Sequence, residues 1–117
     1  MTREDILRCY SFVKDQPEES LEVLVATDGV LFYNGPTEEQ LRQDFEKYFR
    51  IISQFVSSYS ETIKNILKTH SKTVDIIVEI SYILAPAIAQ EYGGIGGVSI
   101  VAALLIMTRR GIHSYLN

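Results

Sequence analysis

Residues 91–111 read EYGGIGGVSIVAALLIMTRRG, with four glycines near the start, then a dense apolar run and two arginines. The preceding residues 74–92 are also apolar, and Glu91 is the one charged residue between Glu79 and Arg109. The two apolar segments predict a pair of helices joined by YGGIGG. A helix that is apolar on all sides must be buried, either in a protein core or in a bilayer.

The lengths of the apolar runs favour a protein core. The dense part, residues 98–107, spans only about 15 Å as a helix, whereas the hydrocarbon layer of a membrane is about 30 Å thick. We therefore expect Ile80, Ile100 and Leu104 to be buried within this chain or a homodimer. Gly93 and Gly97 then allow a tight turn and close backbone contact. The alternative is that residues 74–108 insert into a membrane as a helical hairpin, which the G-x-x-x-G spacing of the two glycines favours.

A glycine-rich loop before a helix can also bind phosphate at the helix N-terminus. The loop GGIGGVS, however, matches neither G-x-G-x-x-G nor the Walker pattern, and no lysine follows it. A helix rather than a strand precedes it. The sequence therefore predicts no bound cofactor.

The N-terminal third predicts a short helix followed by a β-hairpin. Thr2 is a candidate N-cap, and the apolar residues up to position 14 fall on one helical face, although Tyr10 and Phe12 also alternate as in a strand. Two β-rich runs, residues 21–27 and 30–33, flank Asp28-Gly29, a pair typical of a two-residue type I′ turn.

Residues 37–69 predict one long helix. Thr37 and Gln40 have the spacing of a capping box, and apolar residues follow at steps of three and four. A straight helix of this length would measure about 50 Å, longer than a compact domain of this size, so we expect a bend within residues 57–60. The fold class expected from all segments is α+β: a single domain over 1–117, with a helix and a β-hairpin over 1–36 and a bundle of three helices over 37–117.

Charge is unevenly distributed along the chain. The net charge is −4, and residues 1–50 carry eleven acids and six bases. No segment has a basic stripe, so nucleic acid is not an expected partner. The acidic first half is interpreted as solvated surface, with a docking face for a basic partner as the alternative. A single cysteine, Cys9, excludes an intrachain disulfide and favours a reducing, cytoplasmic location; the N-terminal residues lack the apolar segment of a signal peptide.

No set of residues predicts catalysis or metal binding. Cys9 is interpreted as a small core residue, and His70 and His113 as surface residues without ligands at metal-binding spacing. Asp75 and Glu79 mark the wet side of a helix. Glu91 is the acid whose pKa burial would raise, with exposure in the loop as the expected state. Because nothing assembles a nucleophile, a base and an orienting group, we expect no enzyme activity.

The function expected from these features is non-catalytic: a protein-interaction or regulatory module that self-associates through helices, most simply as a homodimer. The candidate interface is an aromatic stripe on the long helix, for which plain core is the other interpretation; the hairpin edge is a second candidate contact. The stripe consists of Phe45, Tyr48, Phe49, Phe55 and Tyr59. The alternative function is that of a small membrane-active protein, of an effector or toxin type, that inserts residues 74–108.

Overall fold

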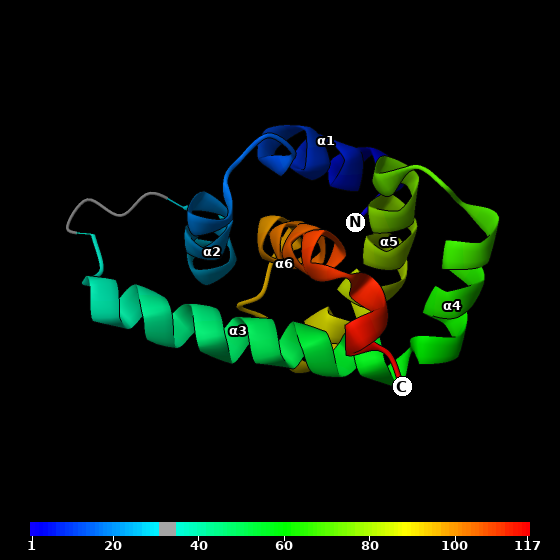
Figure 1. Ribbon diagram of the computed structural model, residues 1–117. Helices are drawn as coiled ribbons and strands as arrows, with labels where there is room; N and C mark the ends of the chain where they lie inside the picture. Colours follow the sequence, from blue (N-terminus) through cyan, green and yellow to red (C-terminus); the bar gives the residue numbers. More distant parts are fainter. Residues whose placement is uncertain (31–34) are drawn as a thin grey trace.

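The computed structural model describes residues 1–30 and 35–117, and these residues form an all-helical bundle (Figure 1). The expected α+β class is therefore wrong, since the described residues contain no strand. The α-helices are α1 (Arg3–Val13), α2 (Glu18–Thr27), α3 (Glu38–Ser58), α4 (Ser60–Thr69), α5 (Thr73–Glu91) and α6 (Gly97–Arg110), followed by the short 3-10 helix η1 (Ile112–Tyr115).

The predicted β-hairpin is the main error. Residues 21–27, its first strand, belong to α2, and the second strand falls largely on residues 31–34, outside the described residues. A short apolar run fits a strand or a buried helix equally well. The helix is favoured by Pro17 at its N-cap and by Glu18 and Glu19 in its first turn, where acids interact well with the helix dipole. The hairpin edge is thereby lost as a contact surface.

Asp28 and Gly29 do adopt the positive φ angles that the turn prediction required, 56° and 74°. They use them to end α2 rather than to join two strands. The Asp28 N–H donates to the C=O of Leu24, at 2.8 Å, and thus closes the last turn of the helix. The local conformation was therefore correct, and the element that it terminates was not.

Helix α6 is the centre of the bundle. Figure 1 shows it enclosed by α1, α2, α3 and α5, and all residues from 99 to 107 are buried. Ile80 and Leu104 are 0% exposed and Ile100 is 2% exposed. Other residues of the same chain cover these three side chains, as the core interpretation predicts.

Both ends of α6 are held by residues that flank α2 in the sequence, Asp28 on one side and Lys14 and Gln16 on the other. The Asp28 carboxylate accepts a hydrogen bond from the Ser99 N–H, at 2.9 Å, so it caps α6 from 71 residues away. A Cβ at Gly96 would overlap that carboxylate, which explains the glycine there. At the other end, the Arg109 guanidinium donates to the backbone oxygens of Lys14 and Gln16, at 3.0 and 2.7 Å.

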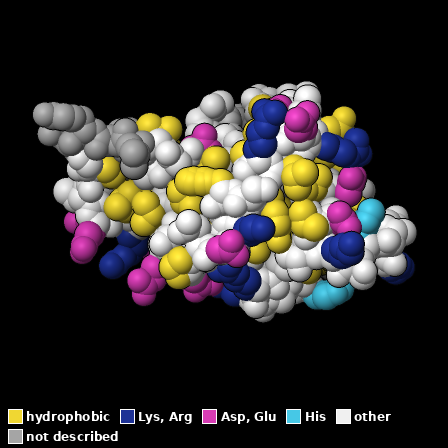
Figure 2. Space-filling view, turned by 90° about the horizontal axis from the view of Figure 1, so that it is seen from above, with side chains coloured by type: hydrophobic (Ala, Val, Ile, Leu, Met, Phe, Trp, Pro, Cys, Tyr) yellow, Lys and Arg dark blue, Asp and Glu magenta, His cyan; other side chains and the backbone are white. Residues whose placement is uncertain are grey.

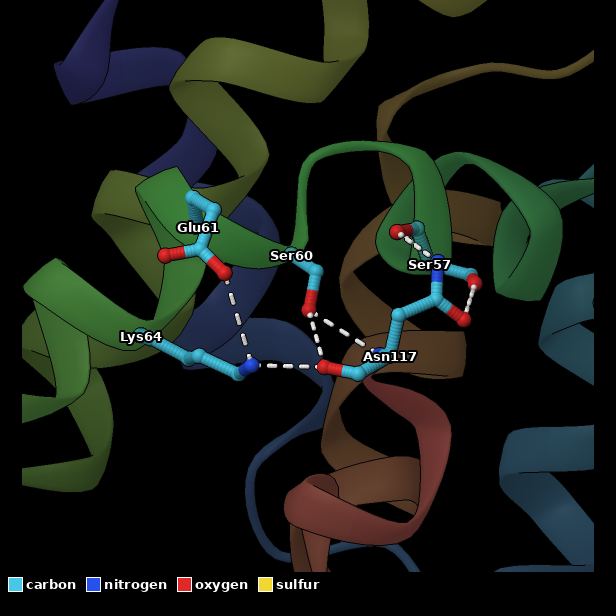
Figure 3. Close-up of polar contacts among 5 residues, drawn as sticks. All are labelled: Ser57, Ser60, Glu61, Lys64 and Asn117. Atoms are coloured by element: carbon cyan, nitrogen blue, oxygen red, sulfur yellow. Dashed lines mark hydrogen bonds and ion pairs between the residues drawn. The ribbon is translucent and has the colours of Figure 1, made fainter.

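The expected bend of the long helix is a break at Tyr59, whose φ and ψ of −100° and 26° separate α3 from α4. Asn117 is hydrogen-bonded to residues on both sides of this break (Figure 3). The Ser60 hydroxyl accepts from the Asn117 N–H at 3.0 Å and donates to its backbone oxygen at 3.2 Å, while Lys64 Nζ donates to the same oxygen at 2.6 Å. Ser57 and the Asn117 side-chain amide exchange two further bonds, at 2.8 and 3.0 Å. These contacts hold Asn117 against the junction of α3 and α4.

Candidate interaction surface

The aromatic stripe of α3 lies mostly against the chain's own core. All five residues, Phe45, Tyr48, Phe49, Phe55 and Tyr59, are half-buried and pack against the hydrophobic cluster. Within the chain, Phe49 meets the ring of Tyr115 edge-on at 6.0 Å, and Phe55 meets Tyr92 at 6.3 Å. Much of the surface that the stripe was expected to offer to a partner is therefore used intramolecularly.

The two glycines of the G-x-x-x-G spacing do not share a helix face. Gly93 lies in the loop after α5, and a Cβ there would have no atom within 4 Å. Gly97 is the first residue of α6, and a Cβ there would meet the side chains of Met1 and Cys9. The spacing thus reflects a turn and one close contact with α1, and not a helix-packing motif.

The helix that offers apolar surface is α5. It carries an exposed row that we call the α5 face: Val74, Val78, Tyr82, Pro86 and Ala89. Their spacing of three and four residues puts them on one side of the helix. Val74 and Val78 are half-buried, and the other three are exposed, with Tyr82 39% exposed. Helix α5 contrasts with α6, which is also apolar but is buried along most of its length.

Among the described residues, α5 is the one helix long and apolar enough to cross a membrane by length and composition. Only 33% of its apolar 18-residue window is buried inside the protein. A core helix of a soluble protein passes the same test of length and composition. The informative observation is therefore the incomplete burial, since large exposed apolar surfaces commonly mark binding sites.

Helix α1 extends the α5 face on one side. A groove of about 320 Å³ lies between the two helices, with Leu7, Val74 and Val78 among its lining residues. Met1, Pro86 and Ala89 are among the residues that line a second hollow, of about 200 Å³. Leu7 is 46% and Met1 57% exposed. Apolar surface therefore follows α5 from its first turns to its last.

Charges of both signs accompany this surface. The Arg3 guanidinium donates two hydrogen bonds to the Glu79 carboxylate, at 2.9 and 3.2 Å, and lies over the Tyr82 ring at 4.0 Å. The hydrogen bond from Arg3 lowers the pKa of Glu79, in spite of the opposing effect of burial. Figure 2 shows the side of the molecule that carries α1, where hydrophobic side chains alternate with basic and acidic ones. The surface has no strong field of one sign.

Of the residues considered for chemistry, His70, Asp75 and Glu79 line the groove between α1 and α5, whereas Cys9 and Glu91 do not. Burial first, and then the charges of Asp28 and Asp5, raise the pKa of the Cys9 thiol, which disfavours the nucleophilic thiolate. Glu91 is exposed at the end of α5. Within residues 1–30 and 35–117, no three His, Cys, Asp or Glu side chains are grouped to hold a metal ion.

Comparison of the chain with protein-family models, with curated proteins and with solved structures gave no match. A functional assignment therefore depends on the residues of this chain and their arrangement.

Proposed function

We propose that the protein is a non-catalytic interaction module that forms a homodimer through the α5 face and the adjoining part of α1. The observation that carries this proposal is the difference in burial between two apolar helices. Helix α6 is covered by its own chain from residue 99 to residue 107, whereas only 33% of the apolar window of α5 is buried. Covering an apolar surface with protein lowers its free energy by about 25 cal/mol per Å².

A second copy is the occupant that the charges favour. A two-fold contact brings the same patch of both subunits together, so the patch must complement itself. The α5 face is bordered by three acids and two bases: Glu4, Asp75, Glu79, Arg3 and Lys72. Because both signs are present, this face repels a second copy less than the acidic surface of residues 18–50 does, and a strongly charged partner gains little from it.

Size-exclusion chromatography with light scattering, in buffer without detergent, tests the proposal. We expect twice the chain mass of 13.3 kDa. The double variant Leu7→Lys with Tyr82→Glu should run as a monomer with an unchanged far-UV circular dichroism spectrum. The matched control is Phe12→Lys, which alters an equally exposed apolar residue of α1 that lies about 140° around the helix from Leu7.

Two results would contradict the homodimer. A wild-type monomer at about 100 µM would limit self-association to weaker than about −5.4 kcal/mol. Dissociation by Phe12→Lys but not by the double variant would put the contact elsewhere.

A second candidate function, association with a membrane, is favoured by the length and hydropathy of α5. Insertion of residues 74–108 as a hairpin would require the bundle to open, because α6 is its centre. Flotation with phosphatidylcholine and phosphatidylglycerol vesicles separates the two candidates. Co-flotation of the wild-type protein, lost in the Leu7→Lys, Tyr82→Glu variant, would assign the α5 face to lipid instead of a second subunit.

A further inference from the structure

A groove on another part of the molecule, between α2 and α3, combines an apolar floor with an acidic rim. Figure 1 shows α2 lying against the N-terminal part of α3, away from α5. The floor consists of Val23, Leu41 and Phe45. Val23 is 43% exposed although it lies among apolar neighbours. The floor is therefore available to a partner in the isolated chain.

The rim of this groove is acidic. Glu19 and Glu22 come from α2 and Glu38 from the first turn of α3, while Arg42 is the one base of the lining. Glu22 has Arg110 at 3.9 Å, whereas Glu19 and Glu38 form no ion pair with any described residue. Two carboxylates at the edge of an apolar floor thus remain available to an incoming cation.

The surrounding surface has the same sign. Residues 18–50 contain eight acids and three bases, so the negative charge of the chain is concentrated on this part. The α5 face, by contrast, is bordered by both signs. The field around the α2–α3 groove attracts a basic partner and repels a second copy of this acidic protein.

The shape of the groove indicates the form of the partner. Its volume of about 220 Å³ lies below the roughly 300–1,000 Å³ typical of small-molecule sites. It is bounded by two helices, with Leu41 and Phe45 one turn apart on α3 and Glu19 and Val23 one turn apart on α2. A third helix packs into such a groove through apolar residues at intervals of three and four.

We propose that the groove between α2 and α3 binds a basic amphipathic helix of another protein, whose apolar side contacts Val23, Leu41 and Phe45 and whose Lys or Arg residues pair with Glu19 and Glu38. This inference goes beyond self-association through α5, and either one can fail without the other. It gives the acidic first half of the chain a role in selecting the partner.

The test uses the full chain and a fluorescein-labelled helical peptide built from Leu and Lys, with Leu on one face, in a fluorescence anisotropy titration. Two control peptides are a scrambled Leu/Lys sequence, which has the same charge without the apolar face, and a Leu/Glu peptide with the charge inverted. We expect saturable binding of the amphipathic Leu/Lys peptide, at least about tenfold weaker binding of the scrambled peptide, and none of the Leu/Glu peptide.

Variants locate the binding site. Glu19→Lys with Glu38→Lys should weaken binding about tenfold, as expected for the loss of two exposed pairs. Glu61→Lys with Glu91→Lys makes the same change in net charge elsewhere and should leave the affinity unchanged. Val23→Ser should weaken binding without changing any charge. The α5 variant Leu7→Lys, Tyr82→Glu should bind the peptide like the wild type.

Four results would overturn the proposal: no binding of any peptide, equal binding of the scrambled peptide, equal weakening by the Glu61, Glu91 control, or full affinity in Val23→Ser. The second and third would reduce the interaction to unspecific attraction by the acidic surface. Circular dichroism of each variant establishes that a loss of binding is not a loss of folding.

Discussion

Asp28 has two structural roles, and different substitutions at this position separate them. Its carboxylate caps α6 through the Ser99 N–H, and its backbone occupies the left-handed region at φ 56°. Loss of an N-cap costs about 1 kcal/mol, and a residue such as Ala in the left-handed region costs roughly another 1 kcal/mol. Asp28→Ala should therefore lower the free energy of unfolding by about 2 kcal/mol.

Two further substitutions at the same position separate the contribution of the cap from that of the left-handed backbone conformation. Asp28→Gly loses the cap but adopts the left-handed conformation freely, so we expect a loss of about 1 kcal/mol. Asp28→Asn keeps an oxygen that can accept from Ser99 and tolerates the left-handed region. It loses only the interaction of the negative charge with the N-terminus of α6, about 0.5 kcal/mol. The expected order of stability is Asp, Asn, Gly, Ala.

Gly96 provides an independent check on the geometry. A Cβ at this position would displace the Asp28 carboxylate, whereas the φ of −96° accepts any residue. Gly96→Ala should therefore be about as costly as losing the cap, about 1 kcal/mol. In the Asp28→Gly background it should be neutral, because the atoms that it displaces are gone.

Urea unfolding followed by far-UV circular dichroism measures these differences, with Asp15→Ala, an exposed acid between α1 and α2, as the control. For a chain of 117 residues, 2 kcal/mol corresponds to a shift of about 8 °C in Tm. The reasoning is refuted if Ala and Asn at position 28 are equally stable, or if Gly96→Ala remains costly without the Asp28 carboxylate.

Three further predictions concern the core and one ion pair. The hydroxyl of Ser81 is buried without a hydrogen-bond partner among the described residues, so Ser81→Ala should raise the free energy of unfolding by about 1 kcal/mol. A lower free energy of unfolding of this variant, measured by urea titration, would show that the hydroxyl is satisfied. Leu104 is 0% exposed at the centre of the bundle, so Leu104→Ala should cost about 2–5 kcal/mol, against less than about 0.5 kcal/mol for the exposed Leu7→Ala; similar losses would contradict the central place of α6. The pKa of Glu79 is lowered by Arg3, so the pair stabilises the fold at neutral pH, and this contribution is lost as the pH falls through the folded-state pKa. The free energies of unfolding of Glu79→Gln and wild type, measured from neutral to acidic pH, should therefore differ at pH 7 and converge once the pH falls below the folded-state pKa of Glu79; a constant difference would argue against the ion pair.

Helix ends that depend on neighbouring residues were correctly read from the sequence. Thr2 and Asp5 form a full capping box at α1. Thr37 accepts from the Gln40 N–H at 3.1 Å, although the Gln40 amide bonds Asp44 instead of completing the box. Gly111 ends α6 with a φ of 101°. Each of these signals involves residues within three or four positions, so the chain needs no tertiary contact to satisfy them.

The candidate surfaces were predicted less well, because exposure is a property of the assembled bundle. The sequence shows an apolar stripe on α3 and an apolar surface all around α5, and neither pattern shows which part the bundle covers. Packing against the core and against Tyr115 and Tyr92 half-buries the whole stripe, whereas three of the five residues of the α5 face remain exposed. The sequence shows the acidic first half through its charge distribution. The apolar floor of the groove between α2 and α3 can be recognised only once the packing of these two helices is known.

The amino-acid sequence alone determined where α1, α3 and α6 begin or end and that residues 98–107 need burial, since hydrogen-bonding caps and hydrophobicity act at short range or on the residue itself. The tertiary structure decided whether residues 21–27 form a strand or a helix, which helix covers which, and that Asp28 caps a helix 71 residues further along the chain. A short apolar run satisfies both periodicities, and the difference is settled by the free energy of packing Leu21 and Val25 against α6. That free energy depends on residues far away in the sequence, so the local helix signals at Pro17, Glu18 and Glu19 do not by themselves exclude a strand.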